Sequence, residues 1–157
     1  MKKILIALDY EPSAEKIAET GNAIATAINA EIILLHVLAE PAYYSSMEYS
    51  PIMGYSGFMD SFNVGISEEV KNNISTLSQE FLDKSKAHLG NENIKTMITE
   101  GSFADSIVKC AENEQADMIV MGSHGRRGLN KLLMENVAEK VLQLSKVPVL
   151  VIPIKTI

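Results

Sequence analysis

Residues 118–136, MIVMGSHGRRGLNKLLMEN, carry an apolar run into a glycine-spaced loop and then into the expected start of a helix. The run over Asp117 to Met121 predicts a short buried strand. Gly122 and Gly125 free the backbone after that strand to approach a ligand closely. Asn136 stands where the last helix should begin, and a helix start offers unpaired N–H groups to an anion. This strand–loop–helix unit therefore predicts a binding corner of the size of a phosphate group.

Near-continuous apolar runs recur along the chain, which is typical of parallel strands covered on both faces. The four strongest are Lys3 to Leu8, Glu31 to Leu38, Asp117 to Met121 and Pro148 to Ile152. A fifth run, Ile94 to Thr99, is more polar and is expected nearer an edge of the sheet.

Helical spacing of apolar residues fills the intervals between these runs. The four patterns comprise Ile17, Gly21, Ile24 and Ile28; Val70, Ile74, Leu77 and Phe81; Phe103, Ile107 and Ala111; and Val137, Val141 and Leu144. The expected helix boundaries agree, with Pro12 in a first turn, Gly90 at a helix exit, and capping boxes at Ser102 with Asp105 and at Asn136 with Glu139.

Strands and helices thus alternate, which predicts one α/β domain over residues 1–157: a doubly wound, five-stranded parallel sheet with helices on both faces. In a strand order of 3-2-1-4-5, the order reverses between the first and fourth strands, and ligands gather at such a point beyond the carboxyl ends. This arrangement places Asp9, which ends the first strand, beside Gly122, which ends the fourth.

The stretch from Ala39 to Gly65 is far longer than an ordinary connection between a strand and a helix. It holds aromatic residues among scattered glycine, serine and proline, which oppose regular structure. We interpret it as an inserted loop that is either disordered or functional, in which case it packs on its own domain, a second subunit or a partner, or forms a lid over a ligand.

Composition excludes several classes of partner. The formal charge is −6 and the isoelectric point is near 5.1, whereas nucleic acids and acidic membranes require a basic face. The single cysteine, Cys110, has no partner for an intrachain disulfide and falls in a helical pattern, so we interpret it as core filler. The first apolar run ends at Asp9, too short for a signal peptide or a membrane span, and we expect a cytoplasmic protein.

Four segments closely resemble the universal stress protein family: KILIALD at the start, LLHV, ADMIVMGSHG and the closing SKVPVLVIP. The resemblance covers almost the whole chain and implies a cytoplasmic stress-response regulator that binds an adenine nucleotide, AMP, ADP or ATP, with at most slow, incidental hydrolysis. It also implies a homodimer that pairs through the short final strand, whose uncovered apolar edge would otherwise invite aggregation.

In nucleotide-binding members of that family, Gly-x-x-Gly, nine residues and then Gly-Ser or Gly-Thr hold the phosphates and ribose of ATP. Gly122 and Gly125 match this motif, whereas Glu135 and Asn136 stand in its last two positions. The family's frequent serine two residues after the aspartate is Glu11 here. By the same resemblance, Asp9 and its neighbours Ala7 and Leu8 would lie against adenosine, Val37 would meet adenine through its backbone, and Met121 and Val137 would complete the wall.

Glu135 brings a carboxylate to the corner that should hold phosphate. Two unit charges about 4 Å apart repel by roughly 4 kcal/mol at an effective dielectric constant near 20. Arg126 or Arg127 could neutralise Glu135, Mg²⁺ could bridge it to phosphate, or its carboxylate could turn into water. Alternatively, Glu135 could itself satisfy the helix start in place of phosphate. The repulsion weakens the binding of AMP or ADP less than that of ATP, because their phosphates need not extend to Glu135.

The histidines offer weaker candidates. His124 lies inside the glycine-spaced loop, where it could contact phosphate. His36 falls within an apolar strand and is expected to be a hydrogen-bonded structural residue, while His88 is expected to be solvated near a helix end. The three histidines and one cysteine show no metal-ligand spacing, and no catalytic triad is recognisable.

Rival nucleotide-binding folds need residues that the chain lacks. A response regulator expects an acidic pair after the first strand, where Asp9 is followed by Tyr10, and a P-loop needs Gly-Lys-Ser or Gly-Lys-Thr. Two functions remain: an adenine-nucleotide-binding stress regulator, and a dimeric interaction module of the same family that has lost its nucleotide and acts through an unknown protein partner.

Overall fold

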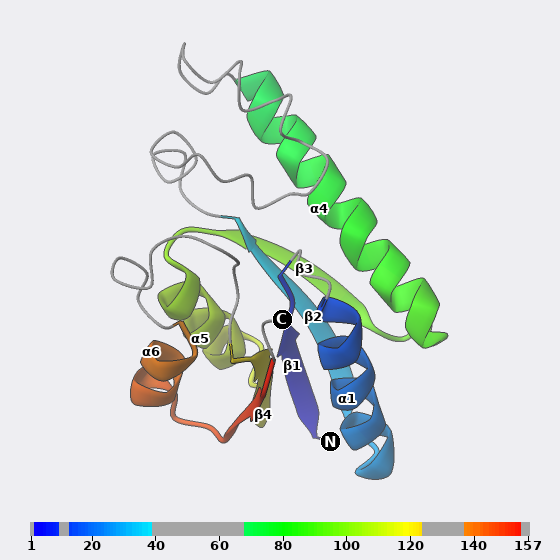
Figure 1. Cartoon of the computed structure of the whole chain (residues 1–157), viewed down its shortest axis with the longest axis vertical. Helices are drawn as coiled ribbons and strands as arrows, with labels where there is room; N and C mark the ends of the chain where they lie inside the picture. Colours follow the sequence, from blue (N-terminus) through cyan, green and yellow to red (C-terminus); the bar gives the residue numbers. More distant parts are fainter. Residues whose placement is uncertain (1, 10–12, 39–67, 124–136, 155–157) are drawn as a thin grey trace.

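The computed structural model describes residues 2–9, 13–38, 68–123 and 137–154. Strands and helices alternate along these segments, as predicted (Figure 1). The elements are β1 (Lys3–Ala7), α1 (Ala14–Ala27), β2 (Glu31–Leu38), α4 (Glu68–Leu89), β3 (Lys95–Glu100), α5 (Phe103–Asn113), β4 (Met118–Gly122), α6 (Val137–Leu144) and β5 (Val149–Ile152).

All five strands form one parallel sheet in the order β3-β2-β1-β4-β5, which confirms the predicted topology. β3 lies at one edge, as its more polar sequence indicated, and β5 lies at the other. The apolar strands occupy the centre because β1 and most of β2 are buried on both faces, with Leu5 and Leu34 fully inaccessible to solvent.

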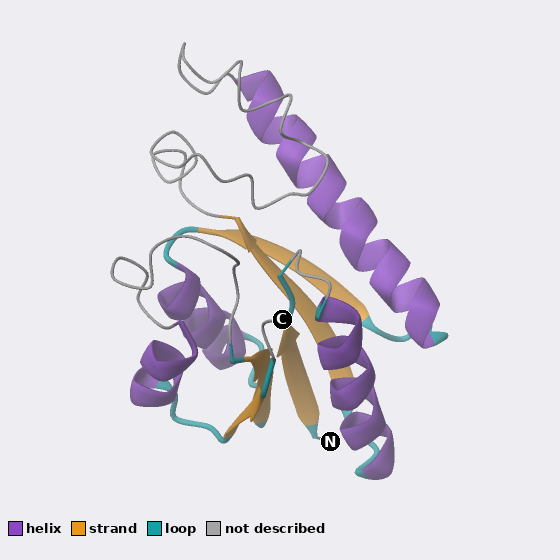
Figure 2. Ribbon diagram, viewed as in Figure 1, coloured by secondary structure: helices purple, strands orange, loops and turns teal. Residues whose placement is uncertain are grey.

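Two helical layers enclose the sheet (Figure 2). Alternate side chains of each strand point to opposite faces, so that β1 contributes Leu5 to one apolar cluster with α5 and α6, and Ile4 and Ile6 to another with α1 and α4. Within the described part of the chain, no helix combines the length and the apolar composition needed to cross a membrane.

Helix α1 approaches β1 closely because a glycine faces the sheet. Ile17, Gly21 and Ala25 follow the four-residue spacing of a buried helix face. A Cβ atom at Gly21 would lie only 2.5 Å from Ile6 Cδ1, so alanine there would require the Ile6 side chain or the helix to shift. The spacing that predicted this helix therefore also fixes its distance from the sheet.

Helix boundaries agree in part with the sequence patterns. Gly90 ends α4 at φ 65°, and its N–H donates to the carbonyls of Lys86 and Ala87, as expected for a glycine at a helix exit. The capping box expected at Ser102 and Asp105 is wrong, because Ser102 is the N-cap of α5 but its side chain makes no capping hydrogen bond. Its carbonyl instead accepts the Ser106 N–H at 2.9 Å, so the backbone begins the helix without the side chain.

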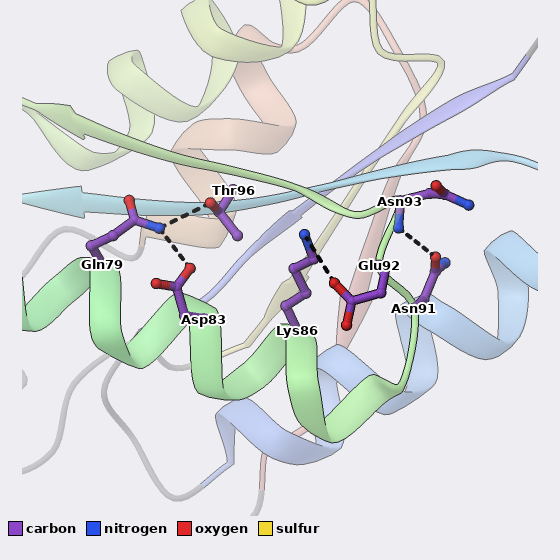
Figure 3. A network of polar contacts seen from close by, with 7 residues as sticks. All are labelled: Gln79, Asp83, Lys86, Asn91, Glu92, Asn93 and Thr96. Carbon is purple, nitrogen blue, oxygen red and sulfur yellow. Dashed lines mark hydrogen bonds and ion pairs between the residues drawn. The ribbon is translucent and has the colours of Figure 1, made fainter.

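Polar contacts join α4 to β3 and to the turn between them (Figure 3). Gln79 Nε2 donates to Asp83 Oδ1 at 2.9 Å and to Thr96 Oγ1 of β3 at 3.0 Å. Further along, Lys86 Nζ lies 4.0 Å from Glu92 Oε2. These contacts hold the edge strand against its covering helix.

The inserted loop expected at 39–65 lies outside the described residues. The same is true of Pro12 and of Asn136, on which two of the predicted helix starts depend.

Candidate functional site

The carboxyl ends of β1 and β4 meet at the reversal of strand order. Ile6 pairs with Val120 in this parallel register, so Asp9 follows β1 and Gly122 ends β4 at the same edge of the sheet. The chain then leaves β1 toward α1 on one face, whereas α6, which follows β4, packs on the other. The predicted juxtaposition of Asp9 and Gly122 is thus present, and it lies where ligands gather in open parallel sheets.

One face of this edge carries an apolar wall, by which we mean Ala7, Val37, Met121 and Val137. All four belong to the cluster between the sheet and α5 and α6. Val37 and Met121 are each 5% exposed, whereas Ala7 and Val137 are half-buried at its margin. Four predicted contact residues from β1, β2, β4 and α6 are therefore brought together, in a setting suited to a flat apolar ring.

Leu8 occupies a different position from these four. Its side chain belongs to the opposite cluster, between the sheet and α1 and α4, and is 4% exposed. A ligand on the apolar wall can therefore meet only its backbone. That backbone is held on both sides: its N–H donates to the Leu35 carbonyl at 2.9 Å, and its carbonyl oxygen lies 2.9 Å from His36 Nδ1.

His36 holds the end of β1 from the neighbouring strand. It is 3% exposed, and its ring meets Phe81 of α4 edge-on, with 6.0 Å between ring centroids. Because a carbonyl oxygen only accepts hydrogen bonds, Nδ1 must carry the hydrogen in its contact with Leu8. The prediction of a hydrogen-bonded structural histidine is confirmed, and the bond fixes the backbone that leads into Asp9.

Gly122 packs closely against two isoleucine side chains on the face opposite the apolar wall. A Cβ atom there would lie 2.6 Å from Ile154 Cδ1 and 2.7 Å from Ile17 Cδ1. The next residue ties the same region to the end of the chain, because the Ser123 N–H donates to the Ile152 carbonyl and Ser123 Oγ accepts the Ile154 N–H, both at 2.9 Å. The sequence predicted that a ligand approaches Gly122 closely. On this face of the sheet, α1 and the segment after β5 approach Gly122 closely instead.

Two buried hydroxyl groups near this edge were missed by the sequence reasoning. Thr99 Oγ1 and Ser13 Oγ are shielded from solvent and make no hydrogen bond in the structure as described. Thr99 pairs with Val37 across β3 and β2, which places its side chain on the same face as the apolar wall. A buried hydroxyl without a partner costs about 1–3 kcal/mol, so Thr99 is a candidate contact for a polar ligand edge.

The remaining site predictions lie outside the described residues. They are Glu11, His124, Gly125, Arg126, Glu135 and Asn136. The described part of the site therefore comprises the strand ends that the resemblance assigns to adenosine, and the contacts with adenosine and with phosphate both stay predictions.

Cys110 is packed in the core rather than poised for chemistry. It is 4% exposed, and its Sγ lies 4.0 Å from Met97 Sδ. Burial raises the pKa of its thiol, and the negative charge of Glu114 acts in the same direction. A raised pKa suppresses the nucleophilic thiolate, which confirms the interpretation of Cys110 as core filler.

Comparison with known proteins gives one consistent result. The profile described as Universal stress protein family matches residues 1–153. Universal stress protein MJ0577 of Methanocaldococcus jannaschii is 34% identical over 96% of this chain and 94% of its own length. A solved structure of MJ0577 has a TM-score of 0.72 at 32% identity and covers 99% of this chain and 98% of that one.

Two more distant structures share the fold and contain nucleotides. A universal stress protein in complex with cAMP has a TM-score of 0.62 at 22% identity, covering 96% of both chains. The universal stress protein from Archaeoglobus fulgidus in complex with dAMP has a TM-score of 0.59 at 16% identity, covering 96% of this chain and 97% of that one.

Proposed function

The chain belongs to the universal stress protein family, and from this premise we propose that it binds an adenine nucleotide at the carboxyl ends of β1 and β4. Under this proposal, the protein is a cytoplasmic regulator in a stress response. The nucleotide serves as a bound signal, and its hydrolysis is at most slow and incidental.

The observation that carries the proposal is the apolar wall beside Asp9. Ala7, Val37 and Met121 bring apolar side chains together at the carboxyl ends of β1, β2 and β4, a composition that suits the face of adenine. Asp9 follows directly, and its carboxylate suits the hydroxyl groups of ribose. The Thr99 hydroxyl, which has no hydrogen-bond partner among the described residues, offers a polar contact at the same face.

Related proteins support the choice of ligand. Members of the fold have been solved with cAMP and with dAMP, and these two ligands share adenine and one phosphate. We infer that adenine and its sugar are the parts recognised here as well, because the described residues suit that end of the molecule.

The residues expected around the phosphates determine which of AMP, ADP and ATP binds most tightly. Glu135 and Glu11 place carboxylates where the family's motif has small residues, and a triphosphate adds further negative charge. We therefore propose that AMP and ADP bind more tightly than ATP. Mg²⁺ reduces this difference in affinity by bridging Glu135 and the phosphates. The corner around the phosphates is formed by Gly122, Gly125, His124, Arg126 and Asn136.

Calorimetric titration of the nucleotide-free protein with AMP, ADP and ATP, each with and without Mg²⁺, tests the proposal. We expect saturable binding of AMP. In the double variant Glu135→Gly with Asn136→Ser, ATP affinity should rise at least about tenfold, which corresponds to ~1.4 kcal/mol.

Glu31→Gln is the matched control, because it removes an exposed carboxylate at the amino-terminal end of β2, at the edge of the sheet opposite the proposed site. No heat and no thermal shift at millimolar AMP, ADP and ATP would exclude the nucleotide-binding function.

A second candidate is a dimeric interaction module that has lost its nucleotide. The two carboxylates at the motif positions favour it, as does the position of β5 at the edge of the sheet with half-buried Val149, Leu150 and Val151. Under either function we propose a homodimer that pairs through β5. Analytical ultracentrifugation should give the mass of two chains, and a monomer mass at every concentration would exclude the dimer.

A further inference from the structure

Three side chains from α1 and α4 converge on the surface away from the apolar wall. Glu15 and Glu19 stand one turn apart on α1, and His88 lies in the last turn of α4. His88 Nε2 is 2.8 Å from Glu19 Oε1 and 3.3 Å from Glu15 Oε1, and one ligand atom from each residue lies within 4.8 Å of the others. Figure 1 shows the end of α4 beside the first turns of α1.

The local charges favour a cation at this point. Two carboxylates one helical turn apart repel each other, so a cation between them is stabilising. The carboxyl end of α4 adds the partial negative charge of its last carbonyl groups. Lys86, in the same last turn, lies toward Glu92 instead. The hydrogen bond to Glu19 raises the pKa of His88, and the charge of Glu15 adds to this effect, so both carboxylates attract positive charge to the ring.

We propose that Glu15, Glu19 and His88 form a binding site for a divalent transition-metal ion, with Zn²⁺ as the probe, that links α1 to α4. One imidazole nitrogen and two carboxylate oxygens suit zinc and its neighbours, whereas Mg²⁺ and Ca²⁺ prefer oxygen alone. Water completes the coordination. Where His88 is protonated, the metal displaces the proton from Nε2 into solvent.

The geometry requires only small movements. Zinc bonds of about 2.0–2.2 Å in a tetrahedral shell set neighbouring ligand atoms about 3.4 Å apart. The contact between His88 and Glu15 already has that length at 3.3 Å, while the contact between His88 and Glu19 must open from 2.8 Å. All three side chains are about half exposed or more, so they can rotate to meet the ion.

This site is separate from the proposed nucleotide site. It lies on the side of the sheet covered by α1 and α4, whereas the apolar wall faces α5 and α6. Zinc binding therefore requires no nucleotide, and failure of either proposal leaves the other in place.

Calorimetric titration of Zn²⁺ into EDTA-treated, nucleotide-free protein at about pH 8 tests the site, because His88 must be neutral to bind metal. We expect one Zn²⁺ per chain at this site, and at least about tenfold weaker binding in His88→Gln and in Glu19→Gln. Glu112→Gln is the matched control, because it removes an exposed carboxylate that pairs with Lys146 at 2.9 Å elsewhere on the surface.

A second measurement is the thermal unfolding midpoint. Zinc at a hundredfold excess over its dissociation constant should raise the midpoint of the wild type and of Glu112→Gln by roughly 5 °C or more, and should leave the midpoint of His88→Gln unchanged. Absence of saturable binding overturns the proposal. Equal affinity in the wild type, His88→Gln and Glu19→Gln also overturns it, because zinc would then bind elsewhere. Circular dichroism in EDTA verifies that each variant is folded. If His88→Gln does not fold, the zinc affinity of Glu19→Gln tests the proposal by itself.

Discussion

Replacing His36 by phenylalanine removes the hydrogen bond that its ring donates to the Leu8 carbonyl at the end of β1. The phenyl ring is similar in size to imidazole and can keep the edge contact with Phe81, so loss of packing is small. The Leu8 carbonyl, however, loses the Nδ1–H donor that lies 2.9 Å away in a buried setting. An unsatisfied buried acceptor costs about 1–3 kcal/mol. For a domain of this size, each kcal/mol shifts the unfolding midpoint by about 2–4 °C, so we expect a midpoint about 2–12 °C lower.

Urea and thermal unfolding of the wild type and His36→Phe measure this loss, with the denaturant slope expected to be unchanged. The ¹³C chemical shift of the Leu8 carbonyl provides a readout independent of packing. It should move upfield in His36→Phe and stay near the wild-type value in His36→Asn, whose amide nitrogen can take the place of Nδ1. A His36→Phe protein as stable as the wild type, with an unchanged Leu8 carbonyl shift, would refute the role assigned to this bond.

Three further predictions concern packing and titration. Gly21→Ala should lower the free energy of unfolding by up to about 2 kcal/mol, because overpacking against Ile6 outweighs a gain of about 1 kcal/mol in helix propensity; urea unfolding measures this, and a more stable variant contradicts it. Cys110 should resist iodoacetamide in the native protein at about pH 8 and react after unfolding, because burial raises its pKa; mass spectrometry would contradict this by finding rapid native alkylation. His88 has a pKa raised in the folded state by Glu19 and Glu15, so its contribution to stability is present below its unfolded value of about 6.5 and is lost as the pH rises through the folded pKa. Thermal unfolding in EDTA should therefore show a larger gap between the wild type and His88→Gln at about pH 6 than at about pH 9, and an equal gap contradicts the assignment.

Most of the fold follows from local patterns in the sequence. The continuous apolar runs ending at Asp9 and Gly122 mark strands buried on both faces, and such strands pair in parallel under short helical crossovers. The polar third strand is expected at an edge, and β3 lies there with both of its end residues, Lys95 and Glu100, exposed. These properties are predictable because each depends on burial, which a strand or helix shows in its own periodicity.

Contacts between distant segments are harder to predict. Glu19 and His88 are 69 positions apart, and neither the spacing of histidines nor the spacing of acids along the chain brings them together. Only the packing of α1 beside α4 does so. The same holds for the Thr99 hydroxyl, because whether it finds a partner among the described residues depends on side chains from other elements. Ser102 shows the converse, because its capping motif is present in the sequence but its side chain does not form the bond.

The position of the strand ends at the candidate site was predictable from the sequence. Asp9 and Gly122 are placed by following an apolar run to its carboxyl end, whereas Val37 and Met121 are named from the family resemblance, and the parallel register brings all of these strand ends to one edge. The different role of Leu8 also follows from strand alternation, because its side chain must point opposite to that of Ala7.

Amide chemical-shift mapping during titration with AMP tests the central claim most directly. We expect saturable shifts centred on Ala7 to Asp9, Val37 and Met121 to Ser123, with small changes at the opposite, amino-terminal edge near Lys3 and Asp117. Absence of saturable shifts, or shifts centred on that opposite edge, would contradict binding at the carboxyl ends of β1 and β4.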